Sequence, residues 1–254
     1  MIENPVLEVI HRHASVRHYK PDPLPKELIE TIIRAAQRAS TSSNLQAWSV
    51  IAVTEAERRQ RLAALCGDQQ HIAEAPLFLA WCADLARLDR VCELRGYKQV
   101  TNYVENFLVA ALDAGIAAQN AALAAESLGL GICYIGAIRN RPEEVIELLA
   151  LPRLTFPIVG MTVGWPARTP RQKPRLPLEA VLHWETYQRK QDEALLAYDR
   201  EMAESGIYAN RQVAIGEPKN VKIYGWMEHS ARRVAQAQRT HLRRVLQQQG
   251  FELE

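Results

Sequence analysis

The chain has 254 residues, of which 48% are hydrophobic and 24% charged, a balance typical of a water-soluble globular protein. Its 31 basic and 29 acidic residues leave a net charge of +2, which provides no long-range attraction for nucleic acid or an anionic membrane. The N-terminus has an early acidic residue and no apolar run of the kind that a signal peptide needs. We therefore expect a cytoplasmic protein that binds neither nucleic acid nor membrane.

The alternation of apolar residues and turn residues predicts secondary structure over most of the chain. In chain order we expect helices over 4–13 and 26–39, a strand over 48–53, a helix over 55–66, a strand over 77–83, a long helix over 107–128, a strand over 132–135, a helix over 142–149 and a strand over 158–163. These elements predict an α+β domain with a central sheet flanked by helices.

The segment 107–128 is long enough to span a bilayer, but its composition argues against a membrane helix. It contains Asp113, Gln119, Asn120 and Glu126, and polar groups at that density are too costly in hydrocarbon. Its many alanines would instead let neighbouring backbones approach closely. We expect a core helix at a large interface or beneath a cofactor.

The C-terminal part of the chain is more polar. We expect one domain over 1–254 whose last part, 185–254, is a helical extension with helices over 185–204 and 228–249. A glycine- and proline-containing loop over 206–225 separates the two helices and is predicted to be mobile. Because this extension has few apolar residues of its own, we expect it to pack over a partner subunit.

Common catalytic signatures are absent from the sequence. It contains no GxGxxG, P-loop, GxSxG or HExxH pattern. Its cysteines form no CxxC pair and have no histidines at zinc spacing, so we expect free thiols in a reducing compartment and no metal site. Any catalytic power is therefore expected to come from a bound cofactor or from residues dispersed along the chain.

Three dispersed clusters remain as candidate binding residues. The first, 12–19, reads RHASVRHY; the second, 40–46, reads STSSNLQ; and the third, 173–177, reads KPRLP. Arginine and lysine can hold a phosphate, and short hydroxyl side chains can donate to a phosphate or a planar heterocycle. Taken singly, each cluster has an ordinary explanation as a solvated basic turn, a helix terminator or a charged linker.

Taken together, the clusters resemble the NADPH-dependent, oxygen-insensitive nitroreductase and flavin reductase family. His13-Ala14-Ser15-Val16-Arg17 is similar to the family's HRSxR, and 67–71 (GDQQH) to its GGQxH. The most specific stretch, from Ala118 to Gly136, looks like the family's AQNAxxAAESLGLGxxYIGG. The resemblance covers residues 7–200 and implies a nitroreductase-like FMN-binding fold, a mixed or antiparallel sheet and a homodimer.

The resemblance also implies roles for individual residues. The residues expected to meet FMN are His13, Ser15, Arg17, Thr41, Ser42, Ser43, Gln69, Tyr134, Ile135, Gly136, Ala137, Lys173 and Arg175. The serines are expected beside the flavin from the partner subunit. Arg17 is expected to stabilise the reduced flavin, and no side-chain acid or base is required because FMN carries the chemistry. Arg17 and Arg211 are the candidates for contact with NADPH.

The sequence departs from the family pattern at Ala14, at Ala137 and in the region around Arg211. Ala14 replaces an arginine, which removes one cation and leaves Arg12 as a candidate substitute. Ala137 stands where a second glycine is common. Arg211 is the only arginine in 206–212, and the stretch 224–233 differs from the usual family ending, so the choice between NADPH and NADH stays open.

The implied activity is a ping-pong reaction in which hydride from NADPH reduces FMN, and a nitroaromatic, a quinone or free flavin then takes the electrons. Two alternatives remain open at this point. The same fold resemblance covers flavin enzymes with other electron acceptors. A protein of another class, an FMN-binding carrier or sensor without turnover, would carry the same binding residues.

Overall fold

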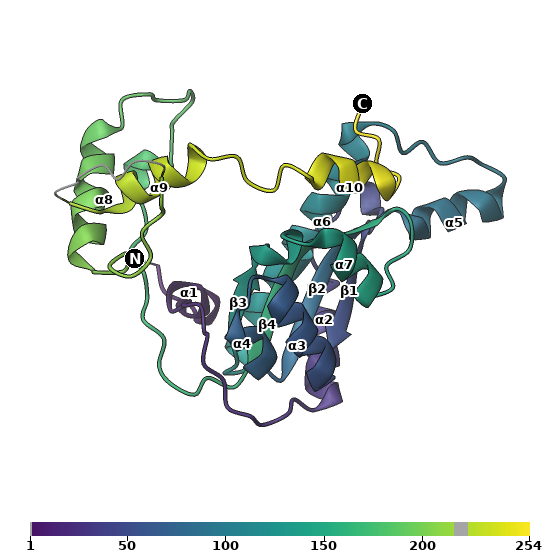
Figure 1. The fold of residues 1–254 in the computed structure, drawn as a ribbon, viewed down its shortest axis with the longest axis horizontal. Coiled ribbons are helices and arrows are strands. Elements are labelled where there is room, and N and C mark those ends of the chain that lie inside the picture. The colour runs from purple at the N-terminus through teal and green to yellow at the C-terminus, as the bar shows by residue number, and fades with distance from the viewer. Residues whose placement is uncertain (1, 216–222) are drawn as a thin grey trace. The chain divides into compact units, whose positions relative to one another are not determined.

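The computed structural model describes residues 2–215 and 223–254, and it divides into two compact units. The first unit comprises 1–172 and 239–254, and the second comprises 173–238. The elements of the first unit are α1 (Pro5–His11), α2 (Lys26–Ala36), η1 (Ser42–Asn44), β1 (Trp48–Val53), α3 (Ala56–Leu65), α4 (Gln70–Glu74), β2 (Leu77–Asp84), α5 (Ala86–Arg95), α6 (Val104–Ser127), β3 (Gly131–Ile135), η2 (Gly136–Arg139), α7 (Pro142–Leu148), β4 (Thr155–Gly164) and α10 (Leu242–Gln248) (Figure 1).

The four strands form one antiparallel sheet in the order β1-β2-β4-β3, which confirms the predicted α+β fold with an antiparallel sheet. The register places the start of β1 beside the end of β2, with Trp48 opposite Ala83. At the other end of the sheet, Gly131 of β3 lies opposite Gly164 of β4. These two ends of the sheet become important for the site.

Helices α2 and α6 cover one face of the sheet (Figure 1). The alanines of α6 pack there against Leu77, Leu79 and Trp81 of β2. The residues between them on β2 face the opposite side, so every residue of β2 is buried and the strand reads as a continuous apolar run. Because alanine has a short side chain, α6 can lie close to the sheet.

The other face of the sheet is covered by α3, α4, α7 and α10. Val245, Leu246 and Phe251 from the C-terminal end are buried in this core, and Phe251 makes an edge-to-face contact with Phe107 at 5.4 Å between ring centroids. The expectation that the C-terminal extension lacks core residues of its own is therefore wrong for its last part. That part completes the core of its own chain.

The second unit contains η3 (Leu178–Ala180), α8 (Asp192–Glu204) and α9 (Trp226–Val234). The predicted helix over 185–204 begins only at 192. The predicted helix over 228–249 is interrupted between α9 and α10, where Arg239 adopts a left-handed conformation with φ of 50° and the chain returns to the first unit. Part of the loop predicted to be mobile, 216–222, lies outside the described residues.

Helix α6 is long enough and apolar enough to cross a membrane, judged by its length and composition alone. Its alanine face is packed against the sheet, and two of its carboxylates, Asp113 and Glu126, are buried and hydrogen-bonded inside the protein. It is the core helix that the sequence predicts.

Candidate functional site

The segment 13–20 is fixed against the end of the sheet where β3 begins and β4 ends. The Val16 amide donates to the Ile132 carbonyl at 2.8 Å, and the Lys20 amide donates to the Trp165 carbonyl at 2.8 Å. A Cβ atom at Gly131 would lie 2.3 Å from Val16 Cγ2, so only glycine allows this approach. Ser15 and Arg17 are therefore held by the backbone next to β3.

His13 is bound to a buried carboxylate at the end of α6. Its Nδ1 atom lies 2.6 Å from Oε1 of Glu126, whose side chain is buried. Arg12 donates from Nη2 to the Glu126 carbonyl oxygen at 3.0 Å. In the structure Arg12 thus binds the C-terminal end of α6, where a cation is favourable.

A cluster of groups without partners lies where 13–20 meets α4. His71 Nε2 is buried and has no hydrogen-bond partner in the described structure. Burial lowers the pKa of His71 to about 4, and the charges of Arg17 and His18 contribute in the same direction. Among the described residues, no hydrogen bond or ion pair joins the Arg17 guanidinium to another group. His71 Nε2 and the Arg17 guanidinium could therefore both bind a polar, negatively charged ligand.

Gln69 lies at the start of the same helix. Its side-chain amide donates to the Cys66 carbonyl at 2.7 Å, which fixes the direction of the side chain beside this cluster. His71, which belongs to the GDQQH stretch, was not among the predicted site residues. The sequence did carry a signal for it, because His71 matches the histidine of the family motif GGQxH.

The predicted stretch 134–137 joins β3 to η2. The Tyr134 hydroxyl donates to Gln119 Oε1 at 3.3 Å, and burial raises the pKa of this hydroxyl, so it stays protonated. A Cβ atom added at Gly136 would make an ordinary van der Waals contact with the end of Arg139, at 3.5 Å. Ala137 packs partly against the core, so its methyl group is accommodated there.

The serine loop, 41–47, is held by a second buried carboxylate of α6. Asp113 Oδ2 accepts from the Thr41 hydroxyl at 2.5 Å and from the Ala47 amide at 3.1 Å, while Oδ1 accepts from the Ser42 amide at 3.1 Å. Between these contacts, Ser43, Asn44 and Gln46 have positive φ angles. The carboxylate therefore binds both ends of a loop with an unfavourable backbone conformation.

The structure does not gather the predicted residues of the first unit at one place. The serine loop leads into β1 at the Trp48–Ala83 end of the sheet, whereas 13–20 docks at the Gly131–Gly164 end. Asp113 and Glu126, which hold the two groups, are thirteen residues apart on α6, or about 20 Å of helix rise. The serine loop and the segment 13–20 thus form two separate groups of predicted residues within the first unit, and we call them half-sites.

The remaining predicted residues belong to the second unit. Arg175 Nη1 donates to the Lys173 and Pro174 carbonyls at 3.0 and 3.3 Å. Arg211 is exposed and follows Tyr208, whose ring stacks on His229 at 4.2 Å. Lys173, Arg175 and Arg211 thus all belong to the second unit.

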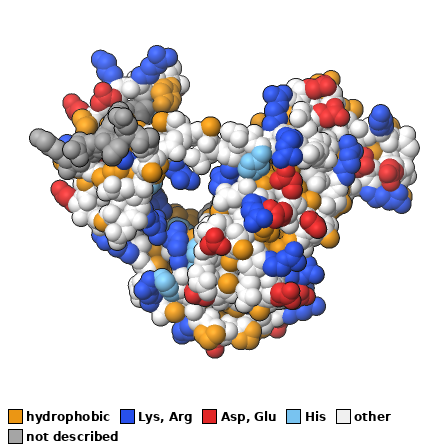
Figure 2. All heavy atoms as spheres, in the orientation of Figure 1, with side chains coloured by type: hydrophobic (Ala, Val, Ile, Leu, Met, Phe, Trp, Pro, Cys, Tyr) orange, Lys and Arg blue, Asp and Glu red, His pale blue; other side chains and the backbone are white. Residues whose placement is uncertain are grey.

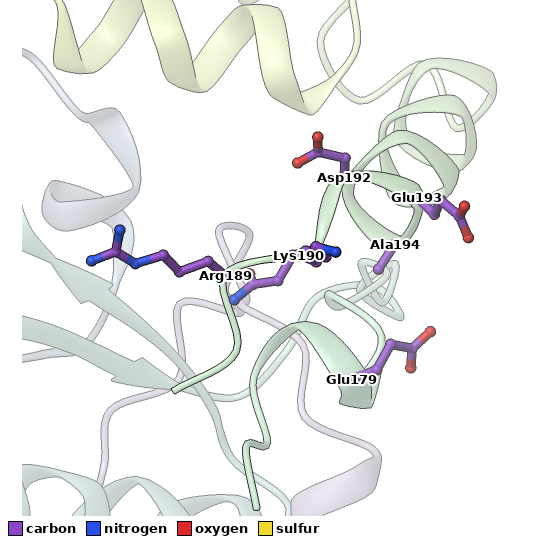
Figure 3. Close-up of a pocket in the computed structure, with 7 residues that line it drawn as sticks. Glu179, Arg189, Lys190, Asp192, Glu193 and Ala194 are labelled. Carbon is purple, nitrogen blue, oxygen red and sulfur yellow. The ribbon is translucent and has the colours of Figure 1, made fainter. Parts of the chain in front are cut away.

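A cavity in the second unit has no group of polar side chains that point to one place. Glu179, Arg189, Asp192 and Glu193 line it, and their charged ends point in different directions rather than toward a common centre (Figure 3). On the face of the first unit seen in Figure 2, acidic and basic side chains are interspersed, and Arg244 of α10 pairs with Glu143 of α7 at 2.6 Å. The arginines of the C-terminal helix are therefore partly used in ion pairs.

Comparison with known proteins adds independent information. Residues 10–165 match the Nitroreductase family, and 173–254 match its C-terminal domain. The chain is 42% identical to FMN reductase [NAD(P)H] of Bacillus subtilis, over 99% of both chains, and 38% identical to the oxygen-insensitive NADPH nitroreductase of Salmonella typhimurium, over 98% of both. It superposes with a TM-score of 0.87 on the NADPH:FMN oxidoreductase of Vibrio harveyi complexed with NAD+, which is 34% identical, with 99% of this chain and 100% of that one covered.

Proposed function

The chain belongs to the nitroreductase family, and on this basis we propose that it is an FMN-dependent oxidoreductase that takes hydride from NADPH. The electrons then pass to a nitroaromatic, a quinone or free flavin in a ping-pong reaction. The single observation that carries the proposal is the group of unpartnered polar atoms beside 13–20. Within residues 2–215 and 223–254, the buried His71 Nε2 atom has no hydrogen-bond partner and Arg17 has no acidic partner.

These residues fit FMN, which presents a phosphate and a heterocycle rich in hydrogen-bonding atoms. When bound, FMN supplies the hydride-accepting and electron-donating chemistry. Arg17 would place a fixed positive charge beside the negative charge that develops on reduction. We assign Lys173 and Arg175 to the phosphate, and Arg17 and Arg211 to NADPH.

We propose further that the enzyme is a homodimer in which each site takes one half from each chain. Asp113 and Glu126, which hold the two half-sites of one chain, are about 20 Å apart along α6, so we assign the two half-sites to different flavins. On the outer side of α6, a stripe of apolar residues at four-residue spacing is exposed: Val104, Leu108, Leu112 and Ile116. A twofold axis near Ile116, at the C-terminal end of this stripe, would pair two α6 helices in antiparallel directions and bring the serine loop of one copy toward 13–20 of the other.

The dimer is tested by placing a charge in the stripe. Leu112 is 55% exposed, so Leu112→Lys leaves the fold of one chain intact while opposing association. We expect the mass in solution to fall from that of two chains to that of one, with loss of bound FMN. A dimeric Leu112→Lys protein with normal FMN content would contradict this interface.

All four cysteines are free thiols, and burial raises the pKa of Cys66 to about 12. Such a thiol is protonated and unreactive, and free thiols are typical of a reducing compartment. We therefore propose a cytoplasmic location.

The activity is tested by following the absorbance of the FMN-loaded protein without oxygen. NADPH is expected to bleach the flavin bands within seconds, and a nitroaromatic is expected to restore them. A carrier or sensor would be yellow but would not consume NADPH continuously when an acceptor is present. A protein that binds no added FMN would refute the proposed function, and comparison of acceptors at saturating NADPH would rank nitroaromatics, quinones and free flavin.

A further inference from the structure

Helix α6 carries two buried carboxylates whose position in the helix has no advantage for the helix itself. Aspartate has a low helix propensity, and Asp113 lies in the interior of α6. Glu126 lies in the last turn, where the partial negative charge of the helix end disfavours a carboxylate. Both are nevertheless almost inaccessible to solvent, with exposures of 2% and 8%. Burying a charge in this way is tolerated only when specific partners compensate it.

The partners of the two carboxylates are the two half-sites. Asp113 receives three hydrogen bonds from the ends of the serine loop. Glu126 binds Nδ1 of His13, which leaves Nε2 as the ring nitrogen available to a ligand. Of the groups packed around Glu126, Arg12 binds its backbone carbonyl, and the negative charge of Glu126 helps to keep the Tyr134 hydroxyl protonated.

We propose that Asp113 and Glu126 are positioning residues and that one α6 helix serves two different flavin sites. This inference rests on the proposed function. Through Asp113 the helix fixes the serine loop for one site, and through Glu126 it fixes His13 for the other. The rigid helix, with a rise of about 20 Å between them, sets the spacing of the two halves. Neither carboxylate touches the cofactor.

The proposal is tested first with single variants of the dimer. Removal of a hydrogen bond to a charged group costs about 1.5–3 kcal/mol, so Asp113→Asn and Glu126→Ala should each weaken FMN binding about tenfold to a hundredfold. Glu126→Gln keeps an acceptor oxygen for His13 and should weaken binding less than Glu126→Ala. Glu147→Gln, an exposed acid on α7, is the matched control and should bind FMN as the unmodified protein does.

The decisive test uses mixed dimers in which one chain carries Asp113→Asn and the other carries Glu126→Ala, isolated with two different affinity tags. If each helix serves two sites, one site combines the altered serine loop of the first chain with the altered His13 contact of the second. The other site then combines the two unaltered halves. One FMN should therefore bind per dimer with unaltered affinity. A general folding defect in each chain could not restore a normal site. Mixed dimers without any tight site, or single variants with unaltered affinity, would overturn the proposal.

Failure of the positioning proposal can be distinguished from misfolding of a variant and from failure of the proposed function. Should Asp113→Asn fail to fold, Thr41→Val removes a donor of the same cluster from the loop side and takes its place in the mixed dimer. If the unmodified protein bound no FMN, the proposed function would fail. The positioning proposal fails by itself if the unmodified protein binds FMN but the single variants bind it equally well, or if the mixed dimers have no tight site.

Discussion

The two units of the chain differ in how they use their apolar residues. The first unit buries two large clusters of apolar side chains, one on each face of its sheet, although other apolar residues, such as Leu108 and Leu112 of α6, stay exposed. In the described part of the second unit, by contrast, Tyr198 and Met202 are the buried large residues, whereas the following are exposed: Leu178, Val181, Leu182, Trp184, Tyr187, Leu196, Ile223, Met227 and Val234. The first unit therefore has a core that can support folding, and the second presents apolar surface suited to a partner or a substrate.

The largest effect is expected from the core of the first unit. Phe251 is fully buried, so Phe251→Ala should destabilise the protein by about 3–5 kcal/mol through lost burial and a cavity. Chemical denaturation of the FMN-free protein measures this free energy of unfolding. A loss below 1 kcal/mol would mean that the C-terminal end contributes little to this core.

His71 provides a pH test of the same unit. Its folded pKa of about 4 lies below the value of about 6.5 for an unfolded chain, so the unfolded state takes up the proton first as pH falls. Stability should therefore decrease between about pH 6.5 and pH 4, with no further contribution below pH 4. The melting temperature of His71→Gln should depend less on pH in this range, and His11→Gln, at an exposed histidine, should behave as the unmodified protein does. Parallel curves for all three proteins would exclude this contribution.

In the second unit, a surface cation should affect binding and not folding. Arg211→Ala removes a charge-assisted contact to the NADPH 2′-phosphate and should raise the KM for NADPH about tenfold, with kcat and the KM for NADH little changed. Steady-state kinetics with both coenzymes measures this, and Arg200→Ala on α8 is the control. Equal changes for NADPH and NADH would show that Arg211 does not read the 2′-phosphate.

The smallest effect is expected from an exposed aromatic residue of the second unit. Trp184 is 75% exposed, so Trp184→Ala should change the unfolding free energy of one chain by less than about 0.5 kcal/mol. Compared with Phe251→Ala, this is the same kind of truncation in the other unit. A loss as large as that of Phe251→Ala, measured under monomeric conditions, would remove the distinction between the units.

Much of the secondary structure could be predicted because its signals are local. The runs WSVIAV and LFLAWCA specify β1 and β2, and polar residues within an alanine-rich segment specify a core helix rather than a membrane span. Helix α5, whose sequence has no clear apolar face, was not predicted. The C-terminal helices were joined in error, because a left-handed residue at Arg239 has no signature when it is not glycine or asparagine.

The sequence by itself determined the family, and with it the cofactor and the type of reaction, because short motifs preserve the residue types that a flavin site needs. It also predicted a set of candidate site residues. The tertiary structure alone showed that the serine loop and the segment 13–20 lie at opposite ends of the sheet and that Asp113 and Glu126 bind them. Contacts between residues far apart in the chain depend on strand register and helix packing, and no local pattern of residues records them.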